Sequence, residues 1–211
     1  MILWTVQDER VLYKLGQGSP YTVDDDHIMF PENEHDNCNH AYRWMVKQMT
    51  ARIGPPPDGT HYPIWAWYKC QGRPDGKPDM RSWRAEEDAT HVVRLKLDVP
   101  DWDVLLTDFD DWNCALNYWY LPRDRADQEA FDKMVKLSGH KWFDVGDMTK
   151  TSPHLEKARR ILERSWERMI GVREAESQYC DLPWKFRTIQ ATFWQIKPEY
   201  VISAKRFRAR H

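Results

Sequence analysis

The stretch HVVRLKLDV, residues 91–99, has the clearest pattern in the chain, because apolar and polar side chains alternate along it. Successive side chains of a β-strand point to opposite faces, so this alternation predicts a strand with one buried and one polar face. A short apolar segment at 104–107 predicts a second strand, and the carboxylates after it can cap a helix over 112–119. Strand and helix therefore follow one another directly in this part of the chain.

The remaining elements follow from the same two periods, alternation for strands and a repeat of three to four residues for helices. We expect strands at 3–7, 62–70, 188–196 and 201–207, and helices at 11–15, 37–53 and 153–170. The helix at 153–170 has the strongest signals, with Ser152 as N-cap, Pro153 at the first helical position and Gly171 after its end.

The order of these elements predicts the fold class. Strands and helices are mixed without regular βαβ spacing, which indicates the α+β class. The length of 211 residues suits a single domain, 1–211, and we expect a central mixed or split β-sheet with flanking helices. The polar stretch 123–151 is expected to form a peripheral insertion with one short helix around 130–137.

Composition excludes several classes of protein. The chain has 31 Lys and Arg against 33 Asp and Glu, a net charge of −2, which lacks the strong positive field of a dedicated nucleic-acid binder. This net charge is still compatible with a local basic patch. The tail KRFRARH at 205–211 is either a frayed terminus or a nucleic-acid contact.

No membrane-spanning run and no secretory signal are visible, so we expect a cytoplasmic protein without a membrane partner. The four Cys residues lie far apart without a C-x-x-C pair, so we expect neither a disulfide scaffold nor a metal site.

The chain contains 12 Trp, and one aromatic cluster stands out. Trp65, Trp67 and Tyr68 lie on one predicted strand. Four cations follow them: Arg73, Lys77, Arg81 and Arg84. Bases stack on aromatic rings while guanidinium groups pair with phosphates, so this segment can bind a nucleotide, with Arg81 among the phosphate-pairing residues. The alternative is that at least one face of the strand belongs to the core.

The segment LTDFDDW places Asp108, Asp110 and Asp111 directly after a strand. Neighbouring carboxylates can hold a metal or act as acid and base. The favoured interpretation is structural: one Asp caps the following helix, and the others lie at the positive end of its dipole.

Several sequence blocks resemble one uncharacterised bacterial family, a domain of unknown function. These blocks are LWTVQ, PIWAWY, LLTDFDDW and IQATFWQI, and together with their neighbours they span almost the whole chain. The resemblance implies a shared fold and names no reaction.

A second resemblance is to ADP-ribosyltransferases that modify nucleic acids. LWTVQDERVLYKLGQG is similar to their first strand and helix, and IQATFWQIKPEYVISAKRF is similar to their last two strands with the intervening turn. The resemblance implies an NAD-binding enzyme that transfers ADP-ribose to a nucleic acid or a protein. Thr5 and Gln7 would then contact NAD from the first strand, and Trp65, Trp67 or Tyr68 would flank nicotinamide.

The same resemblance implies that Gln190 occupies the position of a catalytic Glu, although an amide cannot supply the negative charge of a carboxylate. We therefore expect Gln190 to face the same cleft as Thr5, and the largest pocket to be lined by Thr5 or Gln7 together with one of the strand aromatics. The alternative is a module without enzymatic activity that binds a nucleotide, a nucleic acid or a protein through a Trp-rich face.

Overall fold

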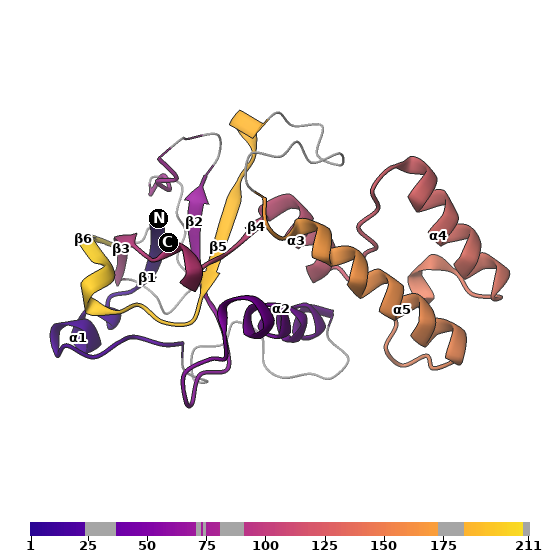
Figure 1. Cartoon of the computed structure of the whole chain (residues 1–211), viewed down its shortest axis with the longest axis horizontal. Helices are drawn as coiled ribbons and strands as arrows, with labels where there is room; N and C mark the ends of the chain where they lie inside the picture. The colour runs from indigo at the N-terminus through magenta and orange to yellow at the C-terminus, as the bar shows by residue number, and fades with distance from the viewer. Residues whose placement is uncertain (24–36, 71–72, 74, 81–90, 173–183, 209–211) are drawn as a thin grey trace.

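The protein is described here from a computed structural model, which defines residues 1–23, 37–70, 73, 75–80, 91–172 and 184–208. Its six strands form one sheet in the order β4-β5-β2-β1-β3-β6, and every neighbouring pair is antiparallel (Figure 1). The strands are β1 Ile2–Asp8, β2 Ile64–Lys69, β3 His91–Asp98, β4 Leu105–Asp108, β5 Ile189–Phe193 and β6 Val201–Arg208. The predicted α+β class is therefore confirmed, with an antiparallel sheet.

The sheet is split between β1 and β2. β1 pairs with β3 along its whole length, from Ile2 to Asp8, whereas it pairs with β2 only where Trp4 lies opposite Trp67. The sheet thus consists of two three-stranded halves, β4-β5-β2 and β1-β3-β6, joined by that pair.

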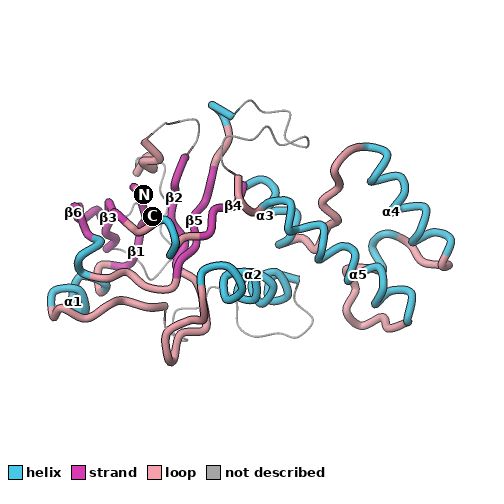
Figure 2. Tube along the Cα trace, in the orientation of Figure 1, coloured by secondary structure: helices cyan, strands magenta, loops and turns pink. Residues whose placement is uncertain are grey.

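The helices are distributed unevenly around the sheet, as the tube in Figure 2 shows. They are α1 Val11–Gly16, α2 Asn37–Ile53, α3 Phe109–Leu116, α4 Arg125–Leu137 and α5 Pro153–Ser165. Helices α4 and α5 lie beyond the β4 edge, with α3 between them and the sheet (Figure 1). Their starts follow from the sequence, because Asp108, Asp124 and Ser152 each accept a hydrogen bond from a first-turn N–H.

The two faces of the sheet pack against different helices. On one, here called the α1 face, Leu3, Leu95 and Ala191 pack with Val11 of α1. On the other, the α2 face, Leu105 packs with apolar residues of α2, α3 and α5. Because directly paired residues of an antiparallel sheet share a face, these packing partners define the face of every strand residue.

The segment 123–151 contributes to the core more than its polar composition predicts. Phe131 and Val135 of α4 and Val145 in the following loop are buried in the same cluster as α2 and α5. Among the described residues, no helix is both long and apolar enough to cross a membrane.

Candidate functional site

One row of directly paired residues crosses the whole sheet on its α2 face. In strand order from β4 to β6 the row contains Thr107, Gln190, Trp67, Trp4, Lys96 and Ser203. We call this set the cross-strand row. The row crosses the split at the Trp4–Trp67 pair. Its end on β4-β5, Thr107 and Gln190, is neutral and polar, and its end on β3, at Lys96, is cationic.

The neutral end of the row is buried and incompletely hydrogen-bonded. Thr107 is 0% exposed and Gln190 is 8% exposed. The hydroxyl of Thr107 and the amide oxygen of Gln190 find no hydrogen-bond partner among the residues that the structure describes. Buried polar atoms are nearly always paired, so two unpaired atoms on directly paired residues are unusual.

The centre of the row is aromatic. Trp67 is half-buried, and its ring centroid lies 5.5 Å from that of Phe109, the first residue of α3. Trp65, two residues earlier on the same face, packs at 4.9 Å against Trp112 and at 5.9 Å against Tyr42. Trp65 therefore belongs mainly to the core, whereas Trp67 lies at the split.

The cationic end of the row converges on a single indole. Lys77 Nζ, Arg94 Cζ and Lys96 Nζ lie 5.6, 5.3 and 5.7 Å from the ring centroid of Trp4. Burial lowers the pKa of Arg94, while Asp79 and Asp75 act in the opposite direction. Three positive charges lie around one ring, and the charges of Asp75 and Asp79 offset part of their mutual repulsion.

The loop that carries Lys77 is fixed over this end by a glycine. Gly76 has φ +65°, and a Cβ there would lie 2.3 Å from the carbonyl oxygen of Tyr68 on β2. Only glycine allows this close approach. The neighbouring Asp75 carbonyl accepts a hydrogen bond of 2.7 Å from the indole Nε1 of Trp4.

Buried charges lie beside the neutral end, where β4 meets α3. Asp108 Oδ1 accepts the backbone N–H groups of Asp110 and Asp111, which confirms the predicted N-cap. Burial, followed by the charge of Asp108, raises the pKa of Asp111 to about 7. The charge of Arg187, which is 1% exposed, partly offsets this increase. Asp111 can thus exchange a proton near neutral pH.

Asp108 has a raised pKa for the same main reason, desolvation by burial. Its second oxygen, Oδ2, has no hydrogen-bond partner within the described part of the chain. The structural interpretation of Asp108 as a cap therefore accounts for only one of its oxygens.

The predicted nucleotide-binding residues are divided between the two faces. Thr5 and Gln7 share the α1 face with Leu3, whereas Gln190 and Trp67 lie on the α2 face. The expectation that Gln190 and Thr5 face one cleft is therefore wrong, because adjacent residues of β1 point in opposite directions. Thr5 instead links the sheet halves: its hydroxyl donates to the Trp65 carbonyl at 2.8 Å and accepts from Gln7 Nε2 at 2.7 Å.

Other predicted residues have separate outcomes. Thr192 lies on the face of Gln190, where its hydroxyl donates to the Leu105 carbonyl at 3.3 Å. Tyr68 is 36% exposed, and Arg81 lies outside the described residues. Two cavities lined by described residues, of about 600 and 130 Å³, include neither Thr5 nor Gln7, so the expected nucleotide pocket stays a prediction.

Sequence reasoning did not assign a role to Thr107, Arg94 or Lys96. The two cations were visible as the polar face of the strand at 91–99. Their position opposite Trp4, however, depends on strand pairing. Within the described residues, no three His, Cys, Asp or Glu side chains are grouped so that they could hold a metal ion.

Comparisons with known proteins give one result. A family model described as "Domain of unknown function (DUF3841)" matches residues 2–202. Searches of curated proteins and of solved structures return no match.

Proposed function

The chain belongs to the family described as domain of unknown function DUF3841, and we propose that it binds a nicotinamide dinucleotide such as NAD across the split between β1 and β2. The observation that supports this proposal is the cross-strand row. It offers hydrogen-bonding groups, two indoles and the Lys96 cation in one line, and Lys77 and Arg94 lie beside its Trp4 indole. A dinucleotide carries the complementary groups: ribose hydroxyls and a carboxamide, flat rings and a pyrophosphate.

In this proposal each end of the row binds a different part of the dinucleotide. Lys77, Arg94 and Lys96 pair with the pyrophosphate, whose negative charge offsets their mutual repulsion. Trp67 and Trp4 provide faces on which a base or nicotinamide stacks. Gln190 and Thr107 use their unpaired atoms to hold the nicotinamide ribose or carboxamide.

The resemblance to ADP-ribosyltransferases extends this binding proposal to a reaction. The bond between nicotinamide and C1′ of the ribose breaks, and nicotinamide leaves with the bonding electrons. The cationic ribose then accepts an electron pair from a nucleophile on a nucleic acid, a protein or water, and the nucleophile loses its proton to solvent. Gln190 is neutral, so its role is to orient the ribose. We expect the reaction in the cytoplasm.

Isothermal titration calorimetry tests the binding step. NAD and ADP-ribose are each titrated into the wild-type chain and into Lys96→Gln and Trp67→Ala variants, with Trp102→Ala as the control because Trp102 is 76% exposed and outside the row. We expect the first two variants to weaken binding about tenfold or more and the control to leave it unchanged. Absence of heat with either ligand at millimolar concentration would contradict the proposal.

Nicotinamide release tests the transfer step separately. Gln190→Ala should lower the rate of NAD cleavage, whereas Gln190→Glu should maintain or raise it, since a carboxylate stabilises positive charge better than an amide. If NAD binds but all three proteins release nicotinamide at the background rate, the chain is a binding module.

A second candidate function, nucleic-acid binding without turnover, is favoured by the edge strand β6. Lys205 and Phe207 pair with Arg94 and Val92 and so extend the cationic end of the row toward solvent. Cations on an edge strand also deter pairing with other chains, which is the structural alternative. Binding of a single-stranded oligonucleotide that weakens steeply with salt, and further on Lys205→Ala, would support this function.

A further inference from the structure

A second candidate site lies away from the sheet, in an open cavity of about 600 Å³ lined by residues of α2, α3, α4, α5 and the loops on both sides of α4. This volume is typical of pockets that bind small molecules. None of its lining residues belongs to the cross-strand row. Whatever binds here does so independently of the dinucleotide proposal.

Six of the fourteen described residues that line this cavity are aromatic. They are Tyr118, Trp119, Tyr120, Phe131, Trp142 and Phe143. Three of these rings remain accessible, since Trp119 is 51%, Trp142 63% and Phe143 49% exposed. Large exposed aromatic side chains around a cavity commonly mark a binding site, because they gain burial only when a ligand covers them.

The polar groups of the cavity are acidic or neutral. Asp132 and Asp147 line it, and no Lys or Arg side chain is among its described lining residues. The amide oxygen of Asn37 is buried at this cavity and has no hydrogen-bond partner within the described chain. A ligand that fits must therefore bring N–H donors, and a negative charge on it would be repelled.

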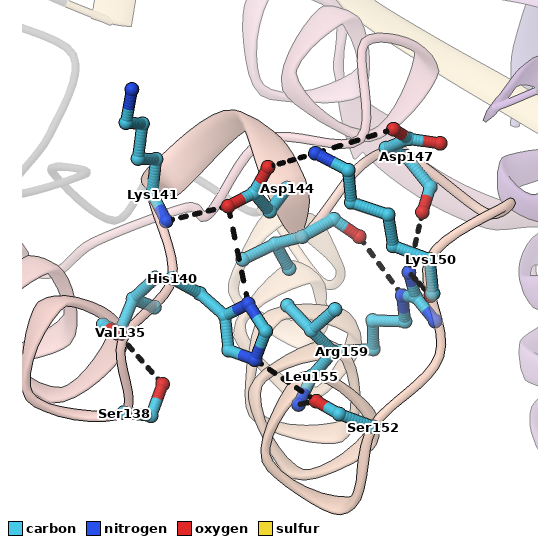
Figure 3. Close-up of polar contacts among 11 residues, drawn as sticks. Val135, Ser138, His140, Lys141, Asp144, Asp147, Lys150, Ser152, Leu155 and Arg159 are labelled. Atoms are coloured by element: carbon cyan, nitrogen blue, oxygen red, sulfur yellow. Dashed lines mark hydrogen bonds and ion pairs between the residues drawn. The ribbon is translucent and has the colours of Figure 1, made fainter.

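The acidic wall is held in place by the network in Figure 3. Arg159 donates hydrogen bonds to the carbonyl oxygens of Val145, Asp147 and Lys150, at 2.9, 2.7 and 2.9 Å. Lys150 forms ion pairs with Asp144 and Asp147. The hydrogen bond from Thr149 lowers the pKa of Asp147, and the charge of Lys150 adds to this effect. Asp147 therefore stays ionised in a fixed loop.

The floor of the cavity has an unusual backbone. Tyr118 has φ +54°, the only positive φ of a non-glycine residue in the described chain. Its hydroxyl donates to Glu163 at 2.8 Å, which anchors the ring. Such conformations carry strain and cluster at ligand sites. Opposite it, Gly146 leaves space that a side chain would fill, because a Cβ there would lie 3.7 Å from Asn37 and 3.9 Å from Tyr118.

We propose that this cavity binds a small organic cation with N–H donors, of the amidinium or ammonium class. The exposed rings of Trp119 and Trp142 provide cation–π faces, Asp132 provides negative charge, and Asn37 accepts one N–H. Lys141 and Lys150 lie near this wall, 5.5 and 5.9 Å from the Phe143 ring, but neither lines the cavity, where a phosphate or carboxylate would meet Asp132.

Three probes of nearly the same shape test the proposal: benzamidine, benzamide and benzoate carry a positive, no and a negative charge. Binding to the full chain is followed by NMR chemical-shift changes of the Trp indole N–H groups. We expect benzamidine to bind at least about fivefold more tightly than benzamide and benzoate not to bind. Equal binding of all three, preference for benzoate, or no binding of benzamidine at millimolar concentration would overturn the proposal.

Variants locate the binding. Gly146→Leu fills the cavity and should abolish benzamidine binding, and Asp132→Asn should weaken it about threefold or more at low salt. Trp102→Ala removes an exposed indole elsewhere and should have no effect. Circular dichroism and thermal unfolding establish that each variant is folded. If folded Gly146→Leu protein binds benzamidine as tightly as the wild type, the site is not in this cavity.

Discussion

The β4-β5 end of the sheet and the helical region around α5 differ in whether their buried polar atoms are hydrogen-bonded. At the sheet, Thr107 Oγ1, Asp108 Oδ2 and Gln190 Oε1 have no partners in the described structure. Around α5, the Ser165 hydroxyl accepts from Leu121 N and donates to the Leu162 carbonyl, and the Trp166 indole donates to the Trp119 carbonyl. The polar groups around α5 therefore contribute hydrogen bonds to stability, whereas those at the β4-β5 end of the sheet are buried without such bonds in the described structure.

The largest effect expected from this contrast is in the helical region. Trp166 is 0% exposed and packs edge-to-face against Trp44 and Tyr118. Trp166→Ala should lower the free energy of unfolding by about 3–5 kcal/mol, through lost burial and a cavity. Urea unfolding measures this loss, with the exposed Trp102→Ala as control. A loss no larger than that of the control would show that the helical region is not the stabilising part.

The next effect is a pH dependence at the sheet region. The folded-state pKa of Asp111, about 7, lies above the ordinary value of 3.8, so the folded protein binds a proton more tightly than the unfolded chain. The contribution of this group to the free energy of unfolding is therefore complete below about pH 4 and is lost as the pH rises to 7. Asp111→Asn should gain stability relative to wild type between pH 4 and 8, by at most about 4 kcal/mol.

Chemical unfolding at a series of pH values measures this difference. Asp110→Asn is the matched control, because Asp110 is exposed one residue away. A difference between Asp111→Asn and wild type that does not change with pH would contradict the assignment of a raised pKa to Asp111.

A pair of hydroxyl deletions compares the two regions directly. Ser165 is 2% exposed with both hydrogen bonds satisfied, so Ser165→Ala leaves the Leu121 N–H without its partner. We expect a loss of about 1–3 kcal/mol in the free energy of unfolding. Thermal and urea unfolding should both show this loss. If Ser165→Ala leaves the stability unchanged, the two regions do not differ in the way described.

The smallest effect is expected at Thr107, the counterpart of Ser165 in the sheet. Thr107→Val replaces an unpaired hydroxyl by a methyl group of similar size, so stability should be unchanged or higher by about 1 kcal/mol or less. The affinity for NAD should fall, because the hydroxyl is assigned to the ligand. A clear loss of stability would mean that the hydroxyl already has a structural partner.

Most of the fold could be predicted from the sequence, because local periodicity determines the elements. The alternation at 91–99 became β3, and Ser152 with Pro153 begins α5. The helix α4 starts at Arg125, earlier than expected from the polar stretch, because Asp124 caps it. Its apolar residues Phe131 and Val135 are too widely spaced among charged residues to reveal how deeply they are buried.

The candidate site was less predictable, because it depends on which strands lie side by side. The sequence identified Trp67 and Gln190 individually, but nothing local to either shows that they are direct neighbours. The assignment of Thr5 to the same cleft failed for a related reason: facing depends on the register of β1 against β2, which a single strand does not reveal. Arg187 lies outside any strand or α-helix, so no period indicated its burial.

The single Trp4–Trp67 pair between β1 and β2 has a consequence for hydrogen exchange. Alternate amides of an antiparallel strand point to opposite neighbours, so β1 shields one set against β3 along its full length and leaves the other set largely outside a ladder. The second set should exchange with deuterium sooner than the first. The exchange rate of each amide in β1 then measures how readily the split opens at that residue. A ligand held across the split would slow that second set and leave the first unchanged.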